Sequence, residues 1–267
     1  AMSTSFDIAL SGLNAHQQAM TVTSHNIANA ATPGYSRQVM DLTTPPSQRT
    51  PIGQIGRGVV VDDIRRVSNR LLNERLREAE VDLARFDQLD KLLADVELAF
   101  AEPGESGVSA AFDRLFAAVE DLAGNPEQGA LRSGFLQQVE AFVGVLNDLD
   151  QRLDTQRADL LAATRAAVGE ANDTLRQLSD LNNEIRAASL SGRSPNDLLD
   201  KRDTLLRDLS QQMDADVSYF TQGASVQVDV NGTVLIAANT ALQMTTKTAS
   251  DGALQVDGDF DIRGGTL

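Results

Sequence analysis

The sequence contains no cysteine, no tryptophan and only two tyrosines among its 267 residues. Without cysteine, disulfide bridges, thiolate nucleophiles and cysteine-ligated metals are all excluded. No run of about 18 apolar residues occurs, so the sequence predicts no transmembrane helix and no membrane insertion. The first residues also lack the basic and apolar segments of a cleaved secretory signal. These absences leave two expectations, a cytoplasmic location or export without signal cleavage.

The charge of the chain is strongly acidic and unevenly distributed. Its 38 acidic and 23 basic residues give a net charge of −15, which argues against a nucleic-acid partner. The first 61 residues hold three arginines and two aspartates, so their net charge is +1 and the rest of the chain carries −16. Leucine, alanine and valine supply most of the apolar content. Combined with many charged residues, this composition favours long helices.

Residues 4–29 form a predicted helix with a single narrow row of large apolar side chains. We call this row the seam; it consists of Phe6, Leu10, Leu13, Met20 and Ile27. Four of these residues are spaced by seven, as in a coiled-coil stripe. One interpretation is a helix that packs on its own domain. The other is a helix that is ordered only by neighbouring helices, because so thin a seam does not offset the entropy lost on ordering.

The stretch "NIANAATPGYSRQ", residues 26–38, predicts a sharp corner after this helix. Asn29 favours helix termination. Thr32–Tyr35 fits a type II turn, because Pro33 fixes φ at the second position and Gly34 accepts the positive φ needed at the third. A loop is expected over residues 44–58, followed by a short strand at residues 59–61.

From residue 68 onward, apolar residues recur at intervals of three and four. This spacing predicts helices over about 72–100, 108–123 and 127–190, and a last helix that we expect the side chain of Asn196 to cap. Four such helices favour an elongated bundle within one chain over coiled coils between chains.

After residue 214 the pattern changes to the alternation typical of strands. "SVQVDVNGTVLIA" predicts a hairpin at Asn231-Gly232. The predicted fold is therefore mainly α with a β-rich outer domain, an α+β class. We expect an amino-terminal axial helix and turn at 1–40, a helical bundle at 41–215 and an antiparallel β domain at 216–267. No element follows the β region, so we expect that domain to be truncated.

No arrangement of residues predicts catalysis, a cofactor or a metal. His16 and His25 are nine residues apart, which does not place them on one helix face. Asp257, Asp259 and Asp261 begin like a calcium loop, but isoleucine occupies the sixth position, where the loop needs glycine. An enzyme alternative, a peptidoglycan hydrolase, would need a carboxylate cleft that no spacing suggests. We therefore predict no enzyme, no cofactor and no metal site.

The segment "ALSGLNAHQQAMTVTSHNIANAATPGYSRQ" resembles the amino-terminal signature of flagellar axial proteins, which comprise rod, hook and hook-associated proteins. The matching residues are Ser11, Gly12, Leu13, Ala15, Asn26, Ile27, Asn29, Thr32, Pro33, Gly34, Tyr35 and Arg37. A second segment, "IGRGVVVDDIRRVSNRLLNERLR", resembles the link into the helical domain. A third, "SPNDLLDKRDTLLRDLSQQM", resembles the segment before the β domain in the hook-associated protein 1 (FlgK) family.

The resemblance implies a structural subunit of the bacterial flagellum, located at the hook–filament junction. It implies secretion through the flagellar type III channel, an export chaperone, self-assembly in the axial tube, and contacts with hook protein and adjacent junction or filament proteins. The seam residues would carry subunit assembly in the inner wall, where the family pairs the first helix with a carboxy-terminal helix absent here. The alternatives are a hook or rod subunit and a non-flagellar coiled-coil adaptor.

Overall fold

The structure is a computed structural model that describes residues 2–51, 53–101, 104, 107–192, 194–220, 223–230, 232–237, 240–248 and 254–259. Contacts between residues divide the chain into two compact units. Unit 1 includes Ala1–Val81 and Glu170–Thr245, and unit 2 includes Asp82–Gly169. The domain boundaries predicted at residues 40 and 215 stay a prediction.

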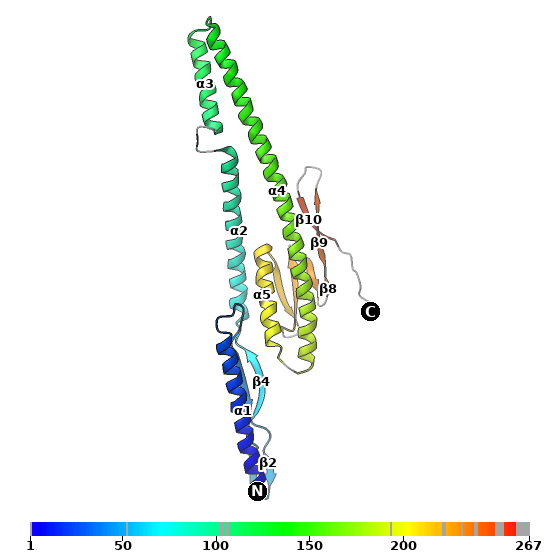
Figure 1. Ribbon diagram of the computed structural model, residues 1–267. Coiled ribbons are helices and arrows are strands. Elements are labelled where there is room, and N and C mark those ends of the chain that lie inside the picture. The colour runs from blue at the N-terminus through cyan, green and yellow to red at the C-terminus, as the bar shows by residue number, and fades with distance from the viewer. Residues whose placement is uncertain are drawn as a thin grey trace. The chain divides into compact units, whose positions relative to one another are not determined.

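Helices make up most of the described chain (Figure 1). They are α1 (Met2–Ala28), α2 (Arg70–Phe100), α3 (Val108–Gly124), α4 (Gly129–Leu190) and α5 (Asn196–Gln212). Each predicted helix is confirmed to within a few residues, because its apolar residues recur every three or four positions. Proline and glycine signals separate the last two helices, as expected.

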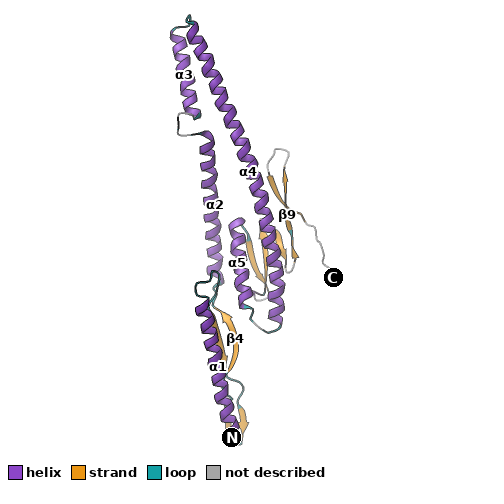
Figure 2. Cartoon of the chain, viewed as in Figure 1, coloured by secondary structure: helices purple, strands orange, loops and turns teal. Residues whose placement is uncertain are grey.

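The described strands form three two-stranded sheets and one four-stranded sheet (Figure 2). β1 (Gln38–Thr43) pairs with β4 (Val60–Arg66) across a register shift, and β2 (Gln48–Thr50) pairs with β3 (Gly53–Ile55). β2 and β3 lie in the predicted loop, and no strand was predicted at β1 either. A four-stranded sheet and a two-stranded sheet follow α5; their strands are β5 (Asp216–Phe220), β6 (Ser225–Val230), β7 (Thr233–Ala237), β8 (Thr240–Ala241), β9 (Gln243–Thr248) and β10 (Leu254–Asp259).

The predicted hairpin is the β6–β7 pair. The two strands are antiparallel, and Gly232 has the positive φ of +80° that a tight hairpin turn requires. Asn231 lies outside the described residues. The predicted α+β class, mainly helical with an antiparallel β region after the helices, is confirmed.

The core of unit 1 lies between α4, α5 and the four-stranded sheet. Its large apolar side chains that are at most 2% exposed are Leu175, Leu178, Ile185, Leu206, Leu209, Val226, Val228, Leu235 and Ile236. Two asparagines of α4 attach the strands to this helix. The Asn182 side chain both donates to the Val226 carbonyl (2.9 Å) and accepts from its amide (3.2 Å). Asn172 forms the same pair of bonds with Met244, both at 2.8 Å.

Unit 2 has a thinner core. Phe112 of α3 meets Phe142 of α4 edge to face, with ring centroids 4.6 Å apart. The apolar row of α2 is mostly uncovered, since Phe86 is 60% and Leu93 52% exposed. The helices are present as predicted. Among the described residues, however, the apolar row of α2 is not covered as the core of a bundle would be. A single neighbouring helix shields only one side of such a row.

Candidate subunit-assembly site

The corner, which we define as residues Asn26–Gln38, contains the predicted turn. Tyr35 N donates to the Thr32 carbonyl across 3.2 Å, and Gly34 has a φ of +78°. These are the hydrogen bond and the positive φ of a type II turn, so the prediction from Pro33-Gly34 is confirmed. Asn29 follows the last residue of α1, as expected, and its side-chain Nδ2 donates to the His25 carbonyl at 3.0 Å, which caps the end of the helix.

The side chain of Asn26 holds the corner closed. Its Oδ1 accepts from the Tyr35 hydroxyl (2.7 Å) and from Gln38 N (2.8 Å), while its Nδ2 donates to the Gln38 carbonyl (2.8 Å). His25 Nδ1 lies 3.0 Å from the same tyrosine hydroxyl. One side-chain amide therefore joins the end of α1 both to Tyr35 and to Gln38, the first residue of β1. An amide side chain offers an acceptor and a donor side by side, as this arrangement requires.

A second attachment joins α1 to β4. Ser11 Oγ donates to the Ile8 carbonyl (2.7 Å) and accepts from Val59 N (3.2 Å). Gly58 has a φ of +86°, and a Cβ at this position would collide with the Ser11 hydroxyl. The serine and the glycine are therefore required as a pair, because only a residue without a Cβ lets the two segments approach this closely.

The corner is joined to α5 by a buried ion pair. Arg66 Nη1 lies 2.9 Å from Asp200 Oδ1 and 2.7 Å from Asp203 Oδ2, and Asp200 Oδ2 also accepts from Ser36 N at 2.9 Å. The three side chains are between 10% and 19% exposed. Burial lowers the pKa of the Arg66 guanidinium, but Asp203 and then Asp200 outweigh this effect, so the pKa is raised. We call Arg66, Asp200 and Asp203 the clasp.

The prediction that Asn196 caps α5 is wrong. Asn196 is itself the first residue of α5, Pro195 precedes it, and no side-chain hydrogen bond caps the helix. The Asn196 side chain is used on β4 instead, where it accepts from Arg66 N at 3.1 Å and donates to the Ile64 carbonyl. An asparagine serves equally well for either role, so its position before an apolar run could not distinguish them.

Gly34→Ala is expected to lower the free energy of unfolding by about 2 to 3 kcal/mol. The alanine would adopt a positive φ, and its Cβ would collide with Thr204 Oγ1, which already donates to the Asp200 carbonyl. Gly192→Ala is the matched control, since Gly192 has a φ of +73° and open space around it. This substitution should lower the free energy of unfolding by only about 1 kcal/mol. Urea unfolding measures both. Equal losses would contradict the close approach of the corner to α5.

Tyr35→Phe is expected to lower the free energy of unfolding by about 1 kcal/mol at neutral pH, because the hydrogen bond to Asn26 is lost. Burial, followed by Asp197 and Asp200, raises the pKa of the Tyr35 phenol above its usual value of 10.0. The folded chain therefore holds this proton more tightly than the unfolded chain. The extra stability is present below about pH 10 and is lost as the pH rises through the folded-state pKa. The stability gap between the two proteins should narrow in unfolding curves above pH 10; a constant gap would contradict this.

The seam points away from these attachments. Phe6, Leu13, Met20 and Ile27 are 65–72% exposed and Leu10 is 42% exposed, whereas Ala15 on another side of α1 is 4% exposed. The signature residues thus separate into two groups. Ser11, Asn26, Asn29, Thr32, Pro33, Gly34, Tyr35 and Arg37 belong to the attachment near Ser11 or to the corner. The other group is exposed: the side chains of Leu13 and Ile27 are 65% and 72% exposed, although the backbone of Ile27 belongs to the corner, and a Cβ on Gly12 would meet nothing within 4 Å.

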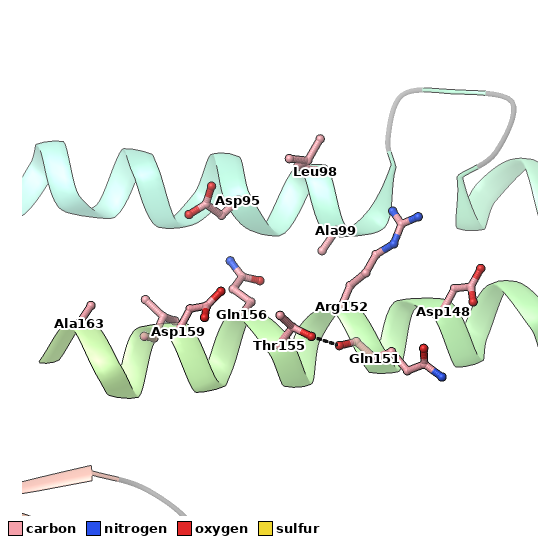
Figure 3. Close-up of a pocket in the computed structure, with 11 residues that line it drawn as sticks. Asp95, Leu98, Ala99, Asp148, Gln151, Arg152, Thr155, Gln156, Asp159 and Ala163 are labelled. Atoms are coloured by element: carbon pink, nitrogen blue, oxygen red, sulfur yellow. Dashed lines mark hydrogen bonds between the residues drawn. The ribbon is translucent and has the colours of Figure 1, made fainter. Parts of the chain in front are cut away.

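A separate groove of about 850 Å³ lies within unit 2 between α2 and α4. Figure 3 shows Gln156 and Arg152 of α4 pointing toward α2, and the Thr155 hydroxyl donating to the Gln151 carbonyl at 2.8 Å. The groove is open and mixed in polarity, with no arrangement of groups suited to a reaction. In the part of the chain that the structure describes, no group of three acidic or histidine side chains could hold a metal ion, and no helix has the length and apolar character to cross a membrane.

Two family models match the chain. The helical domain of flagellar hook-associated protein FlgK matches residues 93–266, and the flagella basal body rod protein family matches residues 6–35. Flagellar hook-associated protein 1 of Salmonella typhimurium (strain LT2) is 32% identical over 252 residues, covering 91% of this chain and 44% of the relative. The protein of the same name from Bacillus subtilis (strain 168) is 28% identical, covering 86% of this chain and 47% of the relative. The chain thus spans less than half the length of these relatives.

The fold is also similar to a solved structure, the flagellar hook junction protein FlgK from Burkholderia pseudomallei. The TM-score is 0.56 at 21% sequence identity, and the similarity covers 67% of this chain and 32% of that one. The match to the helical domain covers more than half of the chain and includes both α4 and α5. A hook or rod subunit and a non-flagellar adaptor do not account for that match. The chain belongs to the FlgK family of flagellar hook-associated proteins, which are structural components of the flagellum.

Proposed function

We propose that the chain is part of a subunit of the hook–filament junction that is exported through the flagellar type III channel and polymerises at the distal end of the hook. The observation that carries this proposal is the exposed seam on a helix whose other side is attached to β1, β4 and the corner. A helix held in place by one side and uncovered on the other presents a surface for association.

The size of the seam fits association between subunits. Its five side chains would each contribute roughly 1.5–3 kcal/mol if buried in a tube of packed helices. That sum suffices to order α1 against its neighbours in a polymer. In the isolated chain, by contrast, the same side chains remain in water. We expect the seam to contact seams of neighbouring subunits and a carboxy-terminal helix of the complete protein.

The partners follow from the names of the relatives and from this surface. We propose contacts with hook protein on one side and with adjacent junction or filament proteins on the other, and an export chaperone before assembly. The absence of cysteine fits a chain that must stay free of disulfides until it leaves the cell.

Localisation in cells tests this function. An epitope inserted in the exposed turn at residues 125–128 of the complete protein would be labelled with gold and viewed by electron microscopy. Label in one band between hook and filament is the expected result, together with an uncleaved protein by intact mass in the medium of cells that lack filament protein. Label along the whole hook would instead indicate a hook subunit, and label retained in the cytoplasm would contradict export.

A further inference from the structure

A small cavity in unit 1 is surrounded by arginines. It has a volume of about 210 Å³ and is lined by residues from the end of β4, the start of α2, α5 and β5. The residues that matter here are Arg66, Arg70, Arg202, Asp203 and Tyr219. The proposed assembly surface on α1 does not involve this cavity.

Tyr219 lies at the centre of this cluster. The guanidinium carbon of Arg70 is 5.5 Å from the ring centroid and that of Arg202 is 5.6 Å from it. Arg77 Nη1 donates to the Tyr219 hydroxyl at 3.4 Å. Three guanidinium groups from two helices therefore lie around one aromatic ring, although their like charges repel one another.

The charges in the cluster do not balance. Asp203 is the acid among the residues that line the cavity, and it is already paired with Arg66. Within the described residues, no carboxylate forms an ion pair with Arg70, Arg77 or Arg202. The lining holds three arginines, Arg66, Arg70 and Arg202, against this one aspartate, which is an excess of two positive charges in a chain whose net charge is −15.

Arg202 is the strongest sign that a partner is missing. Its side chain is only 2% exposed, yet its Nε has no hydrogen-bond acceptor among the described residues. Nη1 donates to the Gly223 carbonyl at 2.7 Å, an acceptor that carries no charge. A buried guanidinium without an anion is costly, because burial removes it from water without supplying an opposite charge.

We propose that this cavity binds a small oxyanion, either a phosphate or the carboxylate of a peptide, between Arg70 and Arg202. The planar guanidinium group presents parallel N–H donors that match two oxygens of such an anion. Arg70 is exposed and can move toward the ligand, while Arg202 is held in place by Gly223 and Tyr219. The ion pair with Arg66 offsets the negative charge of Asp203 and so weakens its repulsion of the anion.

Binding is measured by titration calorimetry and thermal unfolding of the 267-residue chain at pH 7. The probes are inorganic phosphate, acetate and chloride at matched ionic strength. Phosphate or acetate is expected to bind saturably and to raise the melting temperature, as a ligand of the folded state must. Phosphate binding at least tenfold tighter than acetate identifies a phosphate site, and comparable binding identifies a carboxylate site.

Arg70→Gln is the test variant, because Arg70 is exposed and its loss should not prevent folding. Arg75→Gln removes another exposed arginine of α2 that does not line the cavity. Arg70→Gln should weaken binding by at least about tenfold, as expected for losing a charged hydrogen bond, while Arg75→Gln binds as the unaltered chain does. Equal binding by the two variants, or a response to chloride as large as that to phosphate and acetate, would overturn the proposal.

Discussion

Replacing Leu13 with aspartate is expected to abolish assembly at the end of the hook without changing the thermal unfolding of the isolated chain. Leu13 is 65% exposed, so the folded chain does not depend on it. In the polymer the leucine would contribute roughly 1.5–3 kcal/mol by burial, and a carboxylate in its place would have to be buried without a partner. The number of hook–filament junctions in electron micrographs and the melting temperature of the purified chain measure the two effects.

Gln18→Asp is the matched control for this experiment. Gln18 is also exposed on α1, but it lies five residues further on, which places it about 140° around the helix from Leu13. The same negative charge is therefore added on a different face. Junctions should form normally with Gln18→Asp. If Leu13→Asp cells also built normal junctions, the seam would not be the assembly surface, whatever the localisation of the protein.

Asp200→Ala is expected to destabilise unit 1 by about 3 kcal/mol or more, the usual cost of removing one partner of a buried ion pair. The substitution leaves Arg66 with a single carboxylate and removes the acceptor of Ser36 N. It should also release the corner from α5. Chemical unfolding measures the loss, and the fluorescence of the two tyrosines, in a chain without tryptophan, reports the change around Tyr35.

The control is Asp173→Ala, which removes an ion pair with Arg176 on the surface of α4, where both side chains are more than half exposed. A surface pair contributes at most about 1 kcal/mol. A loss of that size for Asp200→Ala as well would mean that the clasp behaves as a surface contact. The corner would then have to be held mainly by Asn26.

Local features of the fold could be predicted because neighbouring residues encode them. Thr32–Tyr35 specifies its turn through the fixed φ of Pro33 and the freedom of Gly34. The spacing of apolar residues in α2 and α4 specifies helices in the same way. The exposure of the seam is consistent with its narrow pattern, since its five large side chains form a single row along a helix of 27 residues.

The partners of the corner could not be predicted in this way. Arg66 and Asp200 are separated by 134 residues, and nothing in their local sequence indicates that they meet. Arg66 and Asp200 each lie in a segment that resembles the family, but such a resemblance does not say which residues are in contact. Asn196 shows the same limit, because its side chain is used by a distant strand and not by the helix that it begins. Long-range contacts of this kind depend on the whole fold.

The sequence separation across the clasp also has a consequence for the order of folding. The core of unit 1 is local, since α4, α5 and the four-stranded sheet follow one another along the chain. The bond from Ser36 to Asp200, in contrast, closes a loop of 164 residues. Closing so long a loop has a large entropic cost that the other contacts of the corner repay only after the core has formed. We therefore expect the contact between the corner and α5 to be the last of unit 1 to form and the first to break.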